Sequence, residues 1–246
     1  MGLLNLKSID LSNNRLSQLP NDVFKGLDNL LSLNLNDNKL QLKQQQYIFK
    51  DLKNLRNLLL EKNTLNDLNR NLFNSLGCLE RLDIGFNKIK ILNSDLFKDL
   101  TCLKRLSFCS NQLKEVPKDL LKFMTNLEVI SMNQNQLKAI HKNLFCGLYH
   151  LTHIILHQNQ IKEINFETFH GLENLTYISL HYNKLEEIHV DTFRGLNKLE
   201  TILLNNNCLN KIETFTYIEK IQAEIKSLKT VTLLQPDIFV RKNSHK

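Results

Sequence analysis

The sequence contains little that would interrupt a regular structure, and it has no long apolar run. Among its 246 residues are only seven glycines and three prolines. There is no low-complexity segment, so we expect disorder only in the tail, residues 236–246. A membrane-spanning helix needs about 18 or more consecutive apolar residues, and no such run exists. The first residues also lack the charged segment, apolar run and cleavage site of a secretory signal peptide.

Motifs for catalysis and metal binding are also missing. The five cysteines include no CxxC pair and no cysteine–histidine spacing typical of zinc. No phosphate-binding loop occurs, and no nucleophile, base and orienting residue fall on neighbouring positions. We therefore predict a protein that is not an enzyme and that holds neither a metal nor another cofactor.

The sequence does contain one motif that is repeated nine times. The phrase is LxxLxLxxN, followed about ten residues later by an aromatic residue, and its copies are 24 residues apart except for one step of 25. A fixed period of this length predicts a solenoid, in which each unit buries its apolar edge only by stacking on its neighbours. The copies begin at Leu6, Leu30, Leu55, Leu79, Leu103, Leu127, Leu151, Leu175 and Leu199.

Each part of the phrase has an expected place in the solenoid. Side chains alternate along a strand, so the fourth and sixth positions, such as Leu82 and Ile84, should point inward. The asparagine ends the strand, and its buried amide can bond the backbone of its own and the adjacent coil. The aromatic series should fill the outer half of the core instead of stacking on ligands. It consists of Phe24, Phe49, Phe73, Phe97, Leu121, Phe145, Phe169 and Phe193.

Phrases such as LKSIDLSNNRLSQLPNDVFKGL, from Leu6 to Leu27, resemble the typical class of leucine-rich-repeat proteins. That class includes Toll-like receptor ectodomains, small proteoglycans and insect leucine-rich immune proteins. The resemblance implies an α/β repeat fold, a horseshoe-shaped solenoid over residues 1–210 with a parallel sheet on its concave face. It also implies an extracellular or secreted protein that binds a protein or pathogen-derived ligand without catalysis. Because a signal peptide and cysteine-rich caps are absent, we expect the sequence to be a fragment of such a protein.

The net charge is +7, and part of it forms a column. Residues 24 apart in a solenoid should lie about 5 Å apart, so Lys90, Lys114, Lys138 and Lys162 should form a stripe on an edge or the convex side. This stripe could bind an anionic, heparin-type glycan in a matrix protein; the alternative is a solvated face, since glutamates interrupt it. Nucleic acid is a less favoured partner, because no aromatic residues are interleaved with the basic ones.

Two further features bear on secretion. Cys78 and Cys102 occupy the same column in adjacent copies, which places their Cα atoms within the range of a disulfide. We expect a bond if the protein is secreted and two free thiols if it is cytosolic. The triplet Asn174-Leu-Thr176 is a candidate glycosylation site.

The outward strand positions of each copy are the third, fifth and seventh, with the eighth at the rim, and together they form the concave surface. In the first two copies these residues are small and polar, whereas copies seven to nine present aromatic and amphipathic side chains of the kind that anchors interfaces. We predict that the ligand contacts His153, Ile155, His157, Tyr177, Ser179, His181, Tyr182 and Leu203. A smaller second candidate consists of Arg81, Asp83, Phe86 and Arg105.

His157 and His181 share one column and should be neighbours. A metal pair is not expected, because no carboxylate or third ligand lies on nearby strand positions. Repulsion between two protonated rings would make ligand affinity change between about pH 5 and 7. The alternative is a pair of ordinary surface histidines.

After Asn207 the repeat ends, and apolar residues recur at three- and four-residue steps, which is typical of an amphipathic helix. Thr216 and Glu219 form a capping box at its start. We predict a helical cap in residues 211–235, with a short coiled coil for dimerisation as the alternative and a final strand at residues 231–234. The apolar series is Phe215, Ile218, Ile221, Ile225 and Leu228.

Overall fold

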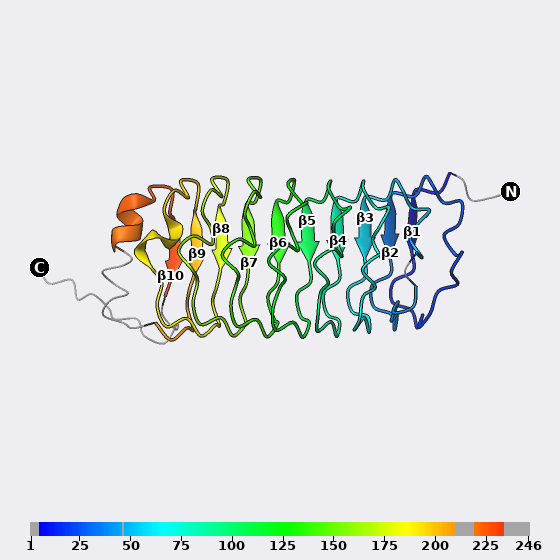
Figure 1. The fold of residues 1–246 in the computed structure, drawn as a ribbon, viewed down its shortest axis with the longest axis horizontal. Helices are drawn as coiled ribbons and strands as arrows, with labels where there is room; N and C mark the ends of the chain where they lie inside the picture. Colours follow the sequence, from blue (N-terminus) through cyan, green and yellow to red (C-terminus); the bar gives the residue numbers. More distant parts are fainter. Residues whose placement is uncertain (1–4, 46, 210–218, 234–246) are drawn as a thin grey trace, which may run out of the picture.

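The computed structural model describes residues 5–45, 47–209 and 219–233. These residues form one parallel sheet of ten short strands, which lie side by side in chain order (Figure 1). Each copy of the repeat contributes one strand, and a tenth follows the last copy. The strands are β1 (Ser8–Asp10), β2 (Ser32–Asn34), β3 (Asn57–Leu59), β4 (Arg81–Asp83), β5 (Arg105–Ser107), β6 (Val129–Ser131), β7 (His153–Ile155), β8 (Tyr177–Ser179), β9 (Thr201–Leu203) and β10 (Thr230–Thr232).

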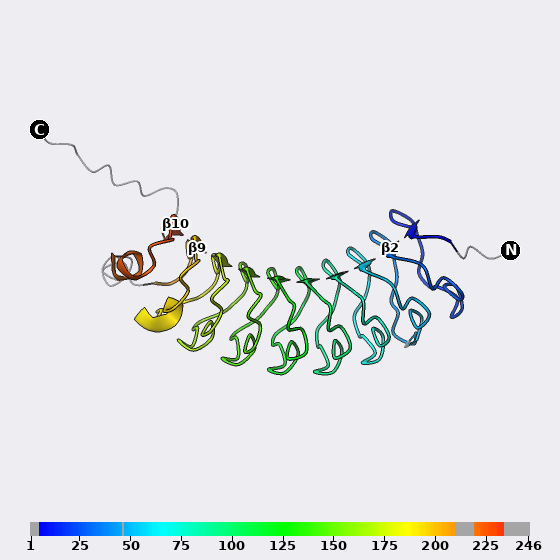
Figure 2. The same ribbon diagram turned by 90° about the horizontal axis from the view of Figure 1, so that it is seen from above.

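The sheet is curved, and its strands line the inner side of the arc while the returning loops fan out on the outer side (Figure 2). The register places equivalent residues of successive copies opposite one another, as in Leu33, Leu58 and Leu82. All three of these leucines are fully buried. The predicted parallel-strand solenoid is therefore confirmed.

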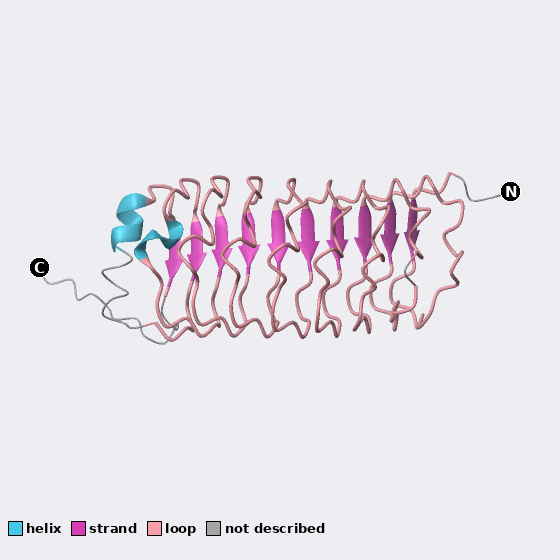
Figure 3. Cartoon of the chain, in the orientation of Figure 1, coloured by secondary structure: helices cyan, strands magenta, loops and turns pink. Residues whose placement is uncertain are grey.

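The expected α/β class is correct only in part, because the described loops contain few helices. They fold mainly as turns with i→i+3 hydrogen bonds: Lys25 N–H donates to the Asp22 carbonyl, and Leu27 N–H donates to the Phe24 carbonyl. This tighter winding places residues three apart on the same side, so that Phe24 and Leu27 both point into the core. The described exceptions are the 3₁₀ helix η1 (Val190–Phe193) and the helical residues 219–224 (Figure 3).

The asparagine ladder is confirmed. The Asn111 amide nitrogen donates to the carbonyls of Phe108 and Cys109 in its own coil and to that of Ile84 in the preceding coil. Its side-chain oxygen accepts from the Ile89 N–H at 2.9 Å. One side chain thus satisfies backbone groups of two coils at the point where the chain leaves the sheet. The same pattern of bonds to the preceding coil occurs at Asn38, Asn63, Asn87, Asn135, Asn159, Asn183 and Asn207.

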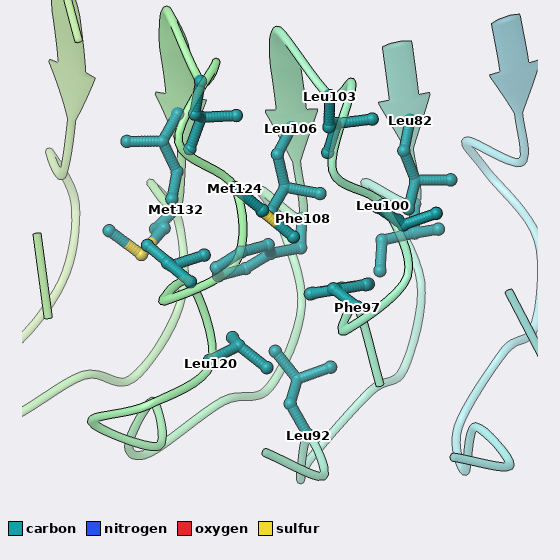
Figure 4. Packing of buried hydrophobic residues seen from close by; sticks show 14 of the residues in the cluster. Leu82, Leu92, Phe97, Leu100, Leu103, Leu106, Phe108, Leu120, Met124 and Met132 are labelled. Carbon is teal, nitrogen blue, oxygen red and sulfur yellow. The ribbon is translucent and has the colours of Figure 1, made fainter. Parts of the chain in front are cut away.

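The phenylalanine spine is also confirmed as core. Its rings are buried, and successive rings stack with centroids 5.9 to 6.4 Å apart. Leu121 interrupts the stack, and the same coil places Phe108 at an inward strand position where the other copies have leucine, isoleucine or methionine. Phe108 points into the core and is fully buried (Figure 4). A large residue at one inward position offsets a smaller one at another, which maintains packing density.

At the C-terminal end, β10 pairs with β9, so a final strand exists, although it spans residues 230–232 and not 231–234. Ile221 and Ile225 belong to the same buried cluster as the coils, and Leu228 packs partly against it. Phe215, Thr216, Ile218 and the predicted disordered tail at 236–246 lie outside the described residues. None of the helical segments within the described ranges has the length and hydropathy of a bilayer-spanning helix.

Candidate functional site

Most of the predicted ligand-binding residues lie together on the concave side of β7 to β9. His153 faces Tyr177 across the sheet, and Ile155 faces Ser179, which in turn faces Leu203. We refer to the outward-facing group as the C-terminal patch. It consists of His153, Ile155, His157, Tyr177, His181, Tyr182 and Leu203, all half-buried except the exposed Tyr182.

The rings of the C-terminal patch hold one another in place. His153 and Tyr177 stack with their centroids 5.5 Å apart, and His157 and His181 stack at 4.4 Å with an interplanar angle of 11°. Tyr182 packs edge-on against His181 at 5.5 Å. Rings that are already ordered lose little further conformational entropy when a ligand binds.

Ser179 is a correction to the predicted site. Ser179 is 0% exposed, so its side chain cannot contact a ligand on the open surface. Its Oγ lies 3.1 Å from His157 Nδ1 and 2.9 Å from His181 Nδ1, and the stacked imidazoles cover it. A hydroxyl has only one proton to donate, so at least one of the two imidazoles donates its Nδ1 proton to the Ser179 oxygen. Ser179 therefore holds the orientation of the two histidine rings and restricts their tautomers.

The histidine pair favours its neutral form. Partial burial lowers the pKa of His157 below its ordinary value of 6.5, and the nearby His181 lowers it further. Burial also lowers the pKa of His181. Protonation of both rings would place two positive charges in contact and leave the Ser179 hydroxyl proton without an acceptor in the pair. At neutral pH the His157–His181 pair is therefore uncharged.

The lack of charge extends over the whole C-terminal half of the concave surface. In copies six to nine, the outward third, fifth, seventh and eighth positions carry no lysine, arginine, aspartate or glutamate. A ligand of this region would be recognised by shape, aromatic contact and neutral hydrogen bonds. The residues at these outward positions are Val129, Ser131, Asn133, Gln134, His153, Ile155, His157, Gln158, Tyr177, Ser179, His181, Tyr182, Thr201, Leu203, Asn205 and Asn206.

The eighth position forms a rim whose backbone conformation the sequence did not reveal. In every copy this residue has a positive φ, between 51° and 56°. Such values suit asparagine and aspartate and are uncommon for bulky side chains. Phe86 and Tyr182 nevertheless occupy the position and are 46% and 53% exposed. The nine residues are Asn13, Asp37, Lys62, Phe86, Ser110, Gln134, Gln158, Tyr182 and Asn206.

One part of this rim, which the sequence analysis did not predict, is a row of hydrogen-bonded side chains. The Gln134 amide nitrogen donates to the side-chain oxygen of Gln158 at 3.0 Å, and the Ser110 hydroxyl bonds Gln134 in turn. These side chains form an ordered polar edge beside the C-terminal patch. The recurrence of amides 24 residues apart was the signal that could have identified it.

The second predicted candidate divides into two parts. Arg81 and Arg105 begin β4 and β5 and lie directly opposite one another. Phe86 follows β4 at the rim, at the other end of the strand, and Asp83 accepts a hydrogen bond from the Gly85 N–H. The arginine pair and the phenylalanine are therefore separate features.

The lysine column remains a prediction. Lys90, Lys114, Lys138 and Lys162 are all exposed. None of them forms an ion pair with any residue that the structure describes. Nothing else in the structure supports a glycan ligand at this column.

No disulfide joins Cys78 and Cys102, the pair for which we expect a bond only if the protein is secreted. Cys78 and Cys102 are both exposed free thiols. Equivalent positions of adjacent coils are related by a simple translation, so their Cα–Cβ bonds run parallel and the Cβ atoms stay about 5 Å apart, whereas a disulfide needs about 3.8 Å. Sharing a column is therefore not sufficient for a bond.

Cys109 and the predicted glycosylation site Asn174 both lie close to neighbouring coils. Cys109 is half-buried on the concave face, where a Cβ on Gly85 would come within 2.9 Å of its sulfur, and burial raises the pKa of the thiol. The Asn174 amide nitrogen donates to the Tyr149 carbonyl at 2.8 Å, and its oxygen accepts from Lys198 Nζ at 2.7 Å. Glycosylation of Asn174 remains a prediction, at a side chain that already joins three coils.

Comparison with known proteins agrees with this geometry. The family model described as Leucine rich repeat matches residues 4–61, 53–108, 103–161, 149–209 and 173–222, which together span most of the chain. The chain belongs to the leucine-rich-repeat family. No curated protein gives a significant match to the sequence.

Solved structures share the fold. A chain of the TLR13–ssRNA13 complex is 25% identical with a TM-score of 0.74, and the match covers 81% of this leucine-rich-repeat chain and 29% of that one. A chain of the octameric complex of Latrophilin 3, Unc5D and FLRT2 (LRR) is 24% identical with a TM-score of 0.84, covering 94% and 70%. The Leptospira interrogans LRR protein LIC12759 is 21% identical with a TM-score of 0.75, covering 94% and 61%. Since the first of these complexes contains RNA, the fold does not exclude a nucleic-acid partner.

Proposed function

We propose that this leucine-rich-repeat protein is a non-enzymatic recognition module that binds a protein or microbial ligand through the C-terminal patch. The observation that supports it most directly is the set of ordered rings on an uncharged part of a rigid sheet. His153, Tyr177, His157 and His181 form two stacked pairs that are only half-buried. Tyrosine is enriched at interfaces because it offers a large contact area at low entropic cost.

The backbone at Tyr182 supports the same proposal. A left-handed conformation costs a bulky residue about 1–2 kcal/mol. Tyr182 nevertheless has a positive φ, and the residue is more than half exposed. An exposed aromatic ring at a position where tyrosine costs stability is a candidate contact residue.

The setting and the C-terminal cap are part of the proposal. The solved structures named above include TLR13 in complex with single-stranded RNA and a complex of Latrophilin 3, Unc5D and FLRT2, and by analogy with them we propose an extracellular, receptor-like protein. The helical residues 219–224 lie next to β10, and Ile221 and Ile225 enter the core cluster, which fits a cap that covers the last coil.

The experiment is a binding screen of the whole chain against purified secreted proteins and microbial surface preparations, followed by measurement of the Kd for each hit. Tyr177→Ala should weaken binding by about tenfold or more, because it removes a central ring. Asn34→Ala, at an outward position of β2, is the matched control and should leave the Kd unchanged. Equal Kd values for Tyr177→Ala and the unaltered protein would overturn the proposal.

The salt dependence separates this function from glycan binding. Contacts at an uncharged patch should persist as ionic strength rises, whereas binding to a lysine column should weaken strongly. The double variant Lys114→Gln, Lys138→Gln should retain full binding to the C-terminal patch. Loss of binding in that variant would favour the glycan-binding alternative.

A further inference from the structure

We propose that Arg81 and Arg105 form an anion-binding subsite of the concave face that takes a phosphate group of the ligand. This inference deepens the proposed binding function and rests on it. The two arginines begin β4 and β5, are paired in register and are exposed. Adjacent strands lie about 4.8 Å apart, and like charges placed directly opposite on a sheet are destabilising. The two guanidinium groups therefore repel one another, and a bound anion would relieve this repulsion.

The neighbouring column shows how the sheet handles charge elsewhere. At the position just before each strand, the signs alternate from coil to coil through Arg56, Glu80, Lys104 and Glu128. Arg56 donates to Glu80 at 3.2 Å, and Lys104 Nζ donates to the other oxygen of Glu80 at 2.9 Å. The bond from Lys104 holds the pKa of Glu80 below its ordinary value. Both oxygens of Glu80 are thus engaged by other cations.

No other described carboxylate compensates the arginine pair. Asp83, two residues after Arg81, uses its Oδ1 to accept the Gly85 N–H at 3.0 Å. Within residues 5–45, 47–209 and 219–233, neither Arg81 nor Arg105 forms an ion pair. Two adjacent positive charges on the concave face therefore have no partner in the part of the chain that the structure describes.

Phosphate matches this pair better than carboxylate does. Each guanidinium presents five N–H donors in a planar fork that fits two oxygens of an anion. A phosphate monoester offers three terminal oxygens and a charge of about −1.5 to −2 at pH 7, close to the charge of two arginines. A single carboxylate has two oxygens and one charge, which would leave one arginine uncompensated.

The subsite also fits the position of the C-terminal patch. β7 is two strands beyond β5, a distance of about 10 Å across the sheet. One ligand could therefore place a phosphate on the arginine pair and an uncharged portion on the rings of β7 to β9. The concave face would then distinguish the two ends of its ligand.

The test is a titration of the whole chain with inorganic phosphate at constant ionic strength, observed through the arginine Nε–H signals in NMR spectra. Phosphate should shift the signals of Arg81 and Arg105 and saturate as a single site. Arg81→Gln together with Arg105→Gln should weaken the Kd by about tenfold or more, since two charge-assisted hydrogen-bonding groups are lost. Arg81→Lys with Arg105→Lys keeps the charge but loses the fork, and should weaken the Kd by an intermediate factor.

Control variants and control anions show whether phosphate binding is specific to the arginine pair. Lys114→Gln with Lys138→Gln removes the same charge from two adjacent exposed residues and should leave the phosphate Kd unchanged. Dimethyl phosphate, a diester with one charge, should bind more weakly than phosphate, and acetate more weakly still. The inference is overturned if the glutamine pair at 81 and 105 binds phosphate normally, if the lysine control loses as much affinity, or if acetate binds as tightly.

Because the probe is inorganic phosphate, this result is independent of the ligand screen. Failure of the proposed function would be seen as an unchanged Kd for the ligand in Tyr177→Ala. Failure of the subsite would be seen in the phosphate titration alone.

Discussion

The concave surfaces of β1–β2 and β8–β9 have the same backbone and opposite uses of their side chains. At the first end, Asp10 accepts hydrogen bonds from the Ser12 N–H and from the Asn34 side chain, which in turn accepts from the Asn36 N–H. The bonds from Ser12 keep the pKa of Asp10 low. At the other end, Tyr177 and Tyr182 offer rings to solvent. The polar side chains of β1–β2 form hydrogen bonds with one another, whereas the rings of β8–β9 leave contact area available to a partner.

The inward residues show no such difference. Leu33 in β2 and Ile178 in β8 are both fully buried, and Phe49 and Phe169 both stack between two neighbouring rings. The comparison teaches that the repeat maintains the scaffold through its inward positions and leaves the outward positions free to vary. The inward and the outward positions can be tested separately.

The largest expected effect tests the shared core. Phe49→Ala and Phe169→Ala should each destabilise the protein by about 3–5 kcal/mol, because each removes a fully buried ring. Chemical denaturation would measure both, with Tyr149→Ala as an exposed aromatic control expected within about 0.5 kcal/mol of the unaltered protein. A large difference between the two phenylalanine variants would show that the two halves of the core are not equivalent.

A second prediction concerns pH and should affect only the C-terminal half. Since the pKa values of His157 and His181 lie below 6.5 in the folded protein, the unfolded chain binds more protons as the pH falls below about 6.5. Stability should therefore be full above that pH and decline below it. Hydrogen exchange should report faster opening at β7 to β9 at low pH, with β1 to β3 little changed.

The variants for this prediction are matched in residue type. His157→Gln with His181→Gln should flatten the pH dependence, and His150→Gln, at an exposed residue in the turn before β7, should not. An unaltered pH profile in the double variant would rule out the histidine pair as its source.

The smallest expected effect exchanges rim residues between the two ends. Tyr182→Asn should stabilise the protein by about 1 kcal/mol, and Asn13→Tyr should destabilise it by a similar amount, because asparagine tolerates positive φ better than tyrosine. Thermal unfolding would measure both. If Tyr182→Asn also weakens ligand binding, the strain at the rim serves recognition; a gain in stability without loss of binding would argue against that role.

Much of the fold could be predicted from the spacing of particular residues. The period placed Asn111 and its equivalents one above another, and their reach to the backbone of two coils followed from that. The same period made neighbours of His153 and Tyr177 and of His157 and His181. Residues 24 apart are adjacent in a solenoid for geometric reasons, so each of these contacts needed no knowledge beyond the sequence.

Other features could not be predicted, because they depend on the direction of side chains. Ser179 occupies an outward position, yet two imidazole rings fold over it and bury it completely. Cys78 and Cys102 occupy the same position of adjacent coils, yet both are free thiols. The positive φ of the rim residues is also invisible in a column that mixes asparagine with phenylalanine, glutamine and tyrosine.

The sequence by itself determined the number of coils, the inward and outward sides of each strand, and which residues would be neighbours, because one periodic pattern specifies all three. Only the tertiary structure decided which outward residues would reach solvent, how the two histidine rings are oriented and which charged side chains have no partner. Those properties arise from contacts between coils that have different side chains at the same position. A repeat pattern records what the coils share, and the candidate binding surface lies where they differ.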